Sequence, residues 1–144
     1  SGHTLDHVVY FSKQNNLLFS GDTLFRFGCG RIFEGTYDEM KRSLNKIEKL
    51  DDSINVYCGH EYTIHNLNFL KGVFHNDKML DEIEHDVLKQ IKNTKTSMPF
   101  NLGNEKKLNP FLSLGSSTYK NFMKRKGFGN VEMFRYLRDL RNNY

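Results

Sequence analysis

The stretch from Leu17 to Asp22, with the sequence LLFSGD, constrains the fold more than any other part of the chain. An apolar run of strand length ends on a glycine, and a single carboxylate follows it. Sheets in α/β proteins hold their functional groups at the carboxyl ends of their strands. We therefore predict an α/β domain in which Asp22 lies at the functional edge of the sheet.

Two histidines occur in similar settings, since His3 precedes the apolar run 8–11 and His60 follows the run 54–57. Imidazole suits zinc and iron, and one carboxylate can reach two cations. We predict that His3, Asp22 and His60 converge as metal ligands, with Asp22 bridging. On spacing alone, a turn or helix cap explains Asp22 equally well.

His3 and His7 are four residues apart, but the neighbouring Val-Val-Tyr-Phe run favours an extended segment over a chelating helix. One ligand and one structural histidine is the better interpretation. The remaining histidines share no ligand spacing, and we expect them to face solvent: His65, His75 and His85.

The composition indicates a protein without membrane spans and with one main domain. The 144 residues suffice for one core, and no stretch approaches the roughly 20 apolar residues of a membrane span. Cys29 and Cys58 form no metal-binding spacing, which favours a reducing compartment such as the cytoplasm. Ser1 resembles the interior of a motif, so targeting cannot be assessed from it. From Asn104 onward, nine Lys and Arg against three Asp and Glu predict attraction for an anion.

Helical periodicity recurs along the chain. Thr36 and Glu39 have the spacing of a capping box, which predicts a helix that begins near Tyr37. Segment 26–35 holds three glycines and predicts an irregular loop. Apolar residues at helical spacing predict helices over 37–50, from 64 to about 74, over 76–92, over 117–126 and from 130.

No strand-like run follows residue 92, so we expect an α/β part over residues 1–74 and a helical appendage over 75–144. In the last helix, Arg135, Arg138 and Arg141 are expected on the face opposite to the residues that dock it. Those docking residues are predicted to be Val131, Phe134, Leu137 and Leu140.

Several motifs occur in a fixed order. They are Gly2-His3-Thr4, Ser20-Gly21-Asp22-Thr23-Leu24-Phe25, Gly28-Cys29-Gly30-Arg31, Phe33-Glu34-Gly35-Thr36, Tyr57-Cys58-Gly59-His60-Glu61-Tyr62-Thr63 and Asn109-Pro110-Phe111. In this order they resemble glyoxalase II, the hydroxyacylglutathione hydrolase of the metallo-β-lactamase superfamily. The resemblance covers nearly the whole chain, and the second and fifth motifs are the most specific.

The resemblance implies a thioester hydrolase of methylglyoxal detoxification that converts S-D-lactoylglutathione to D-lactate and glutathione. It implies a hydroxide activated by two divalent metal ions, with zinc expected first and iron or manganese as alternatives. His3 and His60 would bind the metals, Asp22 would bridge them, and the three would form the catalytic centre. The residues that would contact the substrate are Arg31, Phe33, Tyr62, Arg138 and Arg141.

The chain departs from the family pattern at identifiable positions. Arg31 stands where a lysine is common, which changes the hydrogen-bond geometry but not the charge. Phe33 stands where a tyrosine is usual, so a phenolic hydrogen bond is lost. Asp6 replaces a glycine.

The family's His-x-His-x-Asp-His cluster does not occur in the sequence. Three ligands cannot complete two coordination spheres. We therefore expect the carboxyl-terminal portion of the enzyme, with the second half of an αββα sandwich followed by the appendage. Such a portion is expected to be metal-poor and inactive alone, and to self-associate through its uncovered sheet.

The sequence leaves two alternative functions open. One is another enzyme of the same superfamily, such as an iron-dependent persulfide dioxygenase. The other is a non-catalytic basic module that binds nucleic acid, for which Tyr119, Phe122 and the run 124–126 interleave aromatic and basic side chains. We expect neither nucleic acid nor a membrane as a partner, because the motifs favour the hydrolase.

Overall fold

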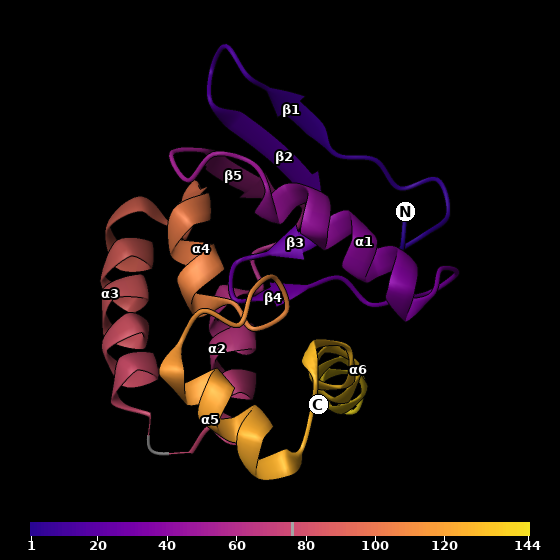
Figure 1. Cartoon of the computed structure of the whole chain (residues 1–144). Coiled ribbons are helices and arrows are strands. Elements are labelled where there is room, and N and C mark those ends of the chain that lie inside the picture. Colours follow the sequence, from indigo (N-terminus) through magenta and orange to yellow (C-terminus); the bar gives the residue numbers. More distant parts are fainter. Residues whose placement is uncertain (76) are drawn as a thin grey trace.

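The computed structural model describes residues 1–75 and 77–144 and contains a mixed sheet of four strands in the order β1-β2-β5-β6 (Figure 1). β2 and β5 run parallel, whereas β1 and β6 are antiparallel to their neighbours. β3 and β4 form a separate two-stranded sheet. The described strands are β1 (Tyr10–Ser12), β2 (Leu17–Gly21), β3 (Leu24–Phe25), β4 (Gly28–Cys29), β5 (Asn55–Cys58) and β6 (Phe100–Asn101).

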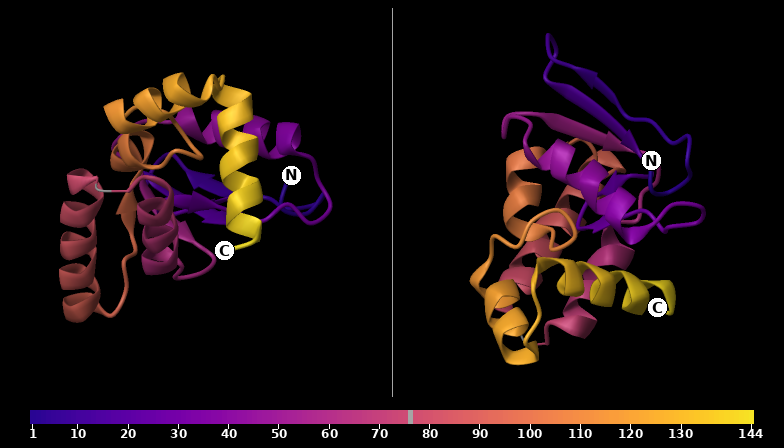
Figure 2. Two further views of the ribbon diagram at one scale, coloured as in Figure 1. Left: turned by 90° about the horizontal axis from the view of Figure 1, so that it is seen from below. Right: turned by 45° about the vertical axis from the view of Figure 1, so that its right-hand side comes forward.

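Helices surround one side of this sheet, as the three views show (Figures 1 and 2). None of the helices in the described part is long and apolar enough to cross a membrane. The helices are α1 (Tyr37–Glu48), α2 (Thr63–Val73), α3 (Lys78–Thr94), α4 (Leu102–Leu108), α5 (Ser117–Lys126) and α6 (Asn130–Asn142). The predicted α/β class with a helical carboxyl-terminal part is therefore confirmed.

The start of α1 follows the predicted capping box. Thr36 Oγ1 accepts a hydrogen bond from the Glu39 backbone N–H at 3.2 Å, and Glu39 Oε2 accepts one from the Thr36 N–H at 2.8 Å. These bonds satisfy N–H groups that the first helical turn leaves without partners. Local sequence therefore determines where α1 begins.

The four-stranded sheet has one covered face and one open face. Leu18 in β2 and Val56 in β5 are fully buried, and α1 packs its own apolar side chains into the same core. The alternate residues point the other way, and the ladder aligns Tyr10, Phe19 and Tyr57 in one row. Their exposed fractions are 70%, 46% and 36%.

The expectation that no strand follows residue 92 was wrong. β6 pairs with β5 through Asn55 with Asn101 and Val56 with Phe100, and it extends the sheet with a strand from the carboxyl-terminal part. Two residues are too few to produce a period that the sequence could reveal. α4, which follows directly, was also not predicted. One cluster of buried side chains spans the chain on both sides of residue 74, and the domain boundary there stays a prediction.

The segment 26–35 is not wholly irregular, because Gly28–Cys29 forms β4 against β3. Phe27, between these two strands, has a φ of 59° and is 1% exposed. A non-glycine residue rarely adopts this left-handed conformation, so surrounding contacts must hold it there. The backbone beside Asp22 is thus more ordered than predicted.

α6 docks in part through the predicted face, since Phe134 and Leu137 are buried as expected. Val131 and Leu140 are 46% and 38% exposed, whereas Arg138 is only 4% exposed, so their predicted positions were wrong. An arginine can be buried when its guanidinium finds hydrogen-bond acceptors. The docked face also includes Met133, Phe134 and Leu137.

Candidate metal and substrate site

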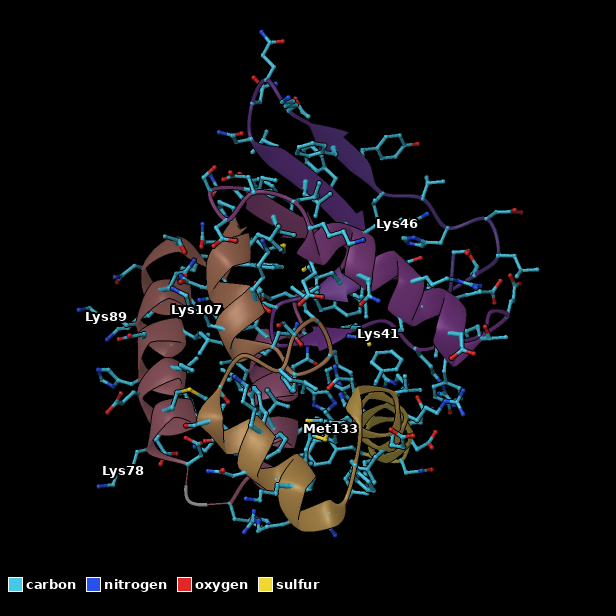
Figure 3. All side chains as sticks on the ribbon, in the orientation of Figure 1. Lys41, Lys46, Lys78, Lys89, Lys107 and Met133 are labelled. Atoms are coloured by element: carbon cyan, nitrogen blue, oxygen red, sulfur yellow. The ribbon has the colours of Figure 1, made fainter. Side chains whose placement is uncertain are left out.

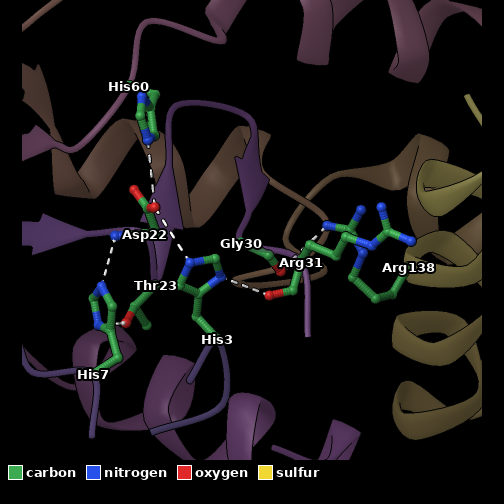
Figure 4. A network of polar contacts seen from close by, with 8 residues as sticks. All are labelled: His3, His7, Asp22, Thr23, Gly30, Arg31, His60 and Arg138. Carbon is green, nitrogen blue, oxygen red and sulfur yellow. Dashed lines mark hydrogen bonds and ion pairs between the residues drawn. The ribbon is translucent and has the colours of Figure 1, made fainter. Parts of the chain in front are cut away.

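The candidate site forms where β2 and β5 end side by side. β2 ends at Gly21, and Asp22 follows immediately; β5 ends at Cys58, two residues before His60. Because the two strands are parallel neighbours, their carboxyl ends meet at one edge of the sheet. His3 reaches the same point from a turn that precedes β1 (Figure 4).

Both histidines approach the same carboxylate oxygen. The Nε2 atoms of His3 and His60 lie 3.3 Å and 3.5 Å from Asp22 Oδ2. The structure thus brings the three predicted ligands together. Their binding of metal stays a prediction.

The hydrogen bond of the other His3 nitrogen identifies the tautomer. His3 Nδ1 lies 2.7 Å from the Arg31 carbonyl oxygen, which can only accept, so Nδ1 carries the proton. In the neutral ring, the Nε2 lone pair then faces the Asp22 carboxylate. Two acceptors at this distance require a cation or a proton between them. A backbone partner on the second nitrogen is typical of histidines that bind metal.

The distance between each histidine and Asp22 also fits two ligands of the same metal ion. Two ligands bound at about 2.1 Å to one tetrahedral ion lie about 3.4 Å apart. The separations of 3.3 Å and 3.5 Å agree with this value, and Asp22 Oδ2 is common to both. These side chains nevertheless form an incomplete shell, because no group of three or more His, Cys, Asp or Glu among residues 1–75 and 77–144 could hold an ion alone.

The strand ends approach so closely that glycine is required. A Cβ atom on Gly59 would lie 2.3 Å from Asp22 Oδ1, and one on Gly30 would lie 1.8 Å from the Asp22 carbonyl oxygen. Any side chain at either position would displace Asp22. The glycines of the Gly-x-Gly and Gly-His motifs therefore allow the backbone to surround the carboxylate.

His7 has a structural position, as predicted for one of the first two histidines. Its Nε2 accepts a hydrogen bond from the Asp22 backbone N–H at 3.0 Å, and its Nδ1 lies 3.2 Å from Thr23 Oγ1. Burial lowers the pKa of His7, and the nearby His3 lowers it further. His7 therefore orients the Asp22 backbone as a neutral ring.

Aromatic and basic side chains flank the predicted ligands. The Tyr62 ring stacks on His60 at 5.0 Å between centroids, and the Phe33 ring meets His3 edge-on at 5.1 Å. Arg31 lies over the Phe33 ring at 5.6 Å. Arg31, Phe33 and Tyr62 are exposed, so a ligand above the carboxylate could contact all three.

Arg138 and Arg141 lie deeper than predicted. Arg138 donates from Nη1 to the carbonyls of Cys29 at 2.8 Å and Gly30 at 3.4 Å, which ties α6 to the loop that carries Arg31. Arg141 donates to Asn66 Oδ1 at 3.3 Å and is half-buried. Contacts of both with a substrate stay predictions, and burial favours a loop-holding role for Arg138.

Sequence reasoning missed Glu61, which fastens the His60 loop to the linker after α3. Its carboxylate accepts from the Ser97 N–H at 2.7 Å, from Ser97 Oγ at 2.6 Å and from Thr96 Oγ1 at 3.0 Å. Burial raises the pKa of Glu61, but hydrogen bonds from Ser97, Thr63 and Thr96 outweigh it and lower the pKa to about 2. The signal available in the sequence was that Glu61, a charged residue, directly follows the candidate ligand His60.

Glu105 and Asn109 were also missed. Glu105 Oε2 accepts the Phe27 N–H at 2.8 Å, and Asn109 Nδ2 donates to the carbonyls of Phe25 and Gly28. These bonds hold the left-handed Phe27 between β3 and β4. In the sequence, Asn109 stands out only through the Asn-Pro-Phe motif, although a buried amide there could signal a backbone clamp.

Comparison with known proteins agrees with this geometry. A family model described as "Hydroxyacylglutathione hydrolase C-terminus" matches residues 61–144, and the metallo-beta-lactamase superfamily model matches residues 1–60. The two matches together cover the sheet edge that carries the candidate ligands and the helical part.

Curated relatives point the same way. The chain is 43% identical over 141 residues to a hydroxyacylglutathione hydrolase of Rhodopseudomonas palustris (strain BisB18), covering 98% of this chain and 55% of the relative. It is 42% identical over 144 residues to one of Bartonella quintana (strain Toulouse), covering 99% and 56%. The chain spans about half the length of these relatives. On these matches, the chain belongs to the hydroxyacylglutathione hydrolase family within the metallo-beta-lactamase superfamily.

Proposed function

We propose that these residues serve a metal-dependent hydrolase that cleaves S-D-lactoylglutathione into glutathione and D-lactate. The observation that carries the proposal is the convergence of His3 and His60 on one oxygen of Asp22. The names of the relatives supply the substrate class. Since three side chains cannot complete two metal shells, the activity requires further ligands.

In the proposed reaction, water adds to the thioester carbonyl carbon, the carbon–sulfur bond breaks, and the sulfur leaves as the glutathione thiol. His3, Asp22 and His60 would hold two divalent ions, zinc in the first place and iron or manganese otherwise. Such ions supply Lewis-acid polarisation of a carbonyl and a lowered pKa for water.

Side chains around the carboxylate would bind the glutathione part. The Tyr62 hydroxyl can donate a hydrogen bond, and Arg31 and Arg141 can pair with carboxylates of the tripeptide. Arg138 would fix the backbone at Gly30, next to Arg31. Burial raises the pKa of both Cys29 and Cys58, the latter to about 11, so neither thiol is a nucleophile in this proposal.

Thiol release from S-D-lactoylglutathione tests the proposal. The chain alone should bind less than two equivalents of zinc and show no turnover. The chain combined with the segment of the Bartonella quintana relative that it does not match should turn over, and Asp22→Asn should abolish this activity. Turnover by the chain alone would contradict the ligand count, and an inactive, metal-loaded combination would contradict the function.

We also propose that the chain self-associates through the open face of the sheet. Tyr10, Phe19 and Tyr57 form an exposed aromatic row, and the Phe19 and Tyr57 rings stack at 5.5 Å. Burying such a row removes apolar surface from water. Sedimentation should show a dimer or larger species, and a clean monomer at high concentration would contradict association.

We further propose a cytoplasmic location. Its support is that Cys29 and Cys58 are free thiols, which a reducing compartment maintains. Fractionation of cells that express the chain would test it, and recovery outside the cytoplasm would contradict it.

A further inference from the structure

A second concave surface lies away from the candidate site. It is a groove of about 970 Å³ between α1, the loop 111–116, α5 and the start of α6. Figure 1 shows where α1, α5, α6 and the loop between α4 and α5 lie on the helical side of the molecule. Asn130 lines it at the start of α6, whereas Arg138 is two turns farther along the same helix. The groove and the candidate site therefore lie toward opposite ends of α6.

Four lysines line this groove. Lys41 lies on α1, Lys49 follows the last residue of that helix, and Lys120 and Lys124 lie on α5. Glu48 is the one carboxylate among the lining residues. None of the four lysines forms an ion pair within the described parts of the chain. Their summed charge gives the groove a positive potential.

Lys41 is the most informative of these cations (Figure 3). It is half-buried, and its Nζ donates to the carbonyls of Phe111 at 3.4 Å and Leu112 at 3.2 Å. Burial lowers the pKa of the Lys41 ammonium, whereas Glu48 raises it. The neutral carbonyls do not cancel the charge of the Lys41 ammonium, so this charge can still attract an anion.

Apolar residues also line the groove, and we call them its apolar floor. Leu112 is fully buried, Met123 and Phe128 are half-buried, and Val131 is 46% exposed. Lysines on a convex surface are well hydrated and have no need of a ligand. Here they share a concave surface with the apolar floor, where field lines focus. An anion with an apolar part matches both the lysines and the floor.

We propose that this groove binds an organic anion that carries at least two negative charges and an aromatic or apolar group. The volume falls within the range of ligand pockets, roughly 300–1,000 Å³. The site is separate from Asp22 and does not depend on the proposed hydrolase function. A nucleoside polyphosphate has the required chemistry, and ATP serves as the probe.

Calorimetric titration of the full chain with ATP tests the proposal, with EDTA present and at about 0.15 M salt to limit non-specific attraction. Saturable binding is expected. The double variant Lys120→Glu with Lys124→Glu should weaken the affinity about tenfold or more, because it replaces two positive charges of the groove with negative ones.

Lys89→Glu with Lys92→Glu is the matched control, because both lysines are exposed on α3 and do not line the groove. It changes the net charge equally, and it should leave the ATP affinity within about twofold if binding is local. Circular dichroism must first show that both variants fold.

Equal losses in the two double variants would overturn the proposal, because they would indicate attraction by net charge alone. Absence of saturable binding would overturn it as well. Tripolyphosphate should bind more weakly than ATP, and adenosine weakest. If tripolyphosphate binds as tightly as ATP, the apolar floor does not contribute, and the proposed ligand class is wrong.

Discussion

The two faces of the four-stranded sheet differ in what they contribute. Leu18 and Val56 on the covered face are fully buried in a core shared with the helices, whereas Phe19 and Tyr57 on the open face remain exposed. Buried polar anchors such as Glu105 join the helical part to the covered side. The difference indicates that folding stability resides on the covered side, whereas the open face leaves aromatic side chains exposed.

Adjacent residues of β2 provide the sharpest test of this difference. Leu18→Ala should reduce the free energy of unfolding by about 2–5 kcal/mol, because it leaves a cavity in the core. Phe19→Ala should change it by less than about 1 kcal/mol and should reduce self-association. Urea unfolding and sedimentation would measure the two effects. Similar losses of stability would show that the open face is also part of the folding core.

The pH dependence of stability tests whether the buried Glu105 carboxyl group anchors the helical part to the covered side of the sheet. Burial raises its pKa from 4.5 to about 7, so the folded state holds the proton more tightly than the unfolded state. Its contribution to stability is therefore greatest below about pH 4.5 and decreases as the pH rises to about 7, by on the order of 3 kcal/mol.

Glu105→Gln retains an acceptor for the Phe27 N–H but removes this titration. The difference in unfolding free energy between the parent chain and the variant should change between pH 4.5 and pH 7. Parallel stability curves would indicate that Glu105 does not titrate in this range.

Within α6, the buried Arg138 and the exposed Arg135 allow the same comparison between a covered and an open position. Arg138→Met should lower the unfolding free energy by about 1–3 kcal/mol, because it leaves the Cys29 and Gly30 carbonyls without their donor. Arg135→Met breaks an exposed pair with Asp38, which contributes about 0–1 kcal/mol, and a contact of the guanidinium with the Tyr37 ring at 5.7 Å. Thermal unfolding of both variants would test this order, and the reverse order would contradict the assignment of Arg138 to the core.

Substrate use should separate these arginines again. In an active complete enzyme, Arg141→Ala should raise KM for lactoylglutathione about tenfold with little change in kcat, because we propose that Arg141 pairs with the glycyl carboxylate of glutathione, which is remote from the thioester. Arg138→Ala should also raise KM, together with its loss of stability. Arg135→Ala is the control and should have little effect. Unchanged KM in all three variants would exclude α6 from substrate binding.

Much of the candidate site could be predicted from the sequence. Asp22 and His60 follow the apolar runs of β2 and β5, whose ends meet because the strands are parallel, whereas His3 precedes β1 and reaches them through a turn. The apolar runs therefore indicated where the ligands lie, and the family resemblance favoured a metal role for Asp22 over a turn or cap. The Thr36 capping box and the apolar periods of the long helices are local in the same sense. Each depends on residues within a few positions of one another.

The tertiary structure alone decided the rest. β6 is two residues long and becomes a strand only because β5 offers it an edge. Arg138 can be buried because the Cys29 carbonyl, 109 residues away, accepts its hydrogen bond. Glu105 can be buried because its carboxyl group accepts a hydrogen bond from the Phe27 N–H. A polar side chain in a sequence specifies what it can bind, but the partner is chosen by packing between distant segments. Local sequence patterns therefore determined the long helices and the central strands, whereas long-range hydrogen bonds determined which charged groups became part of the core.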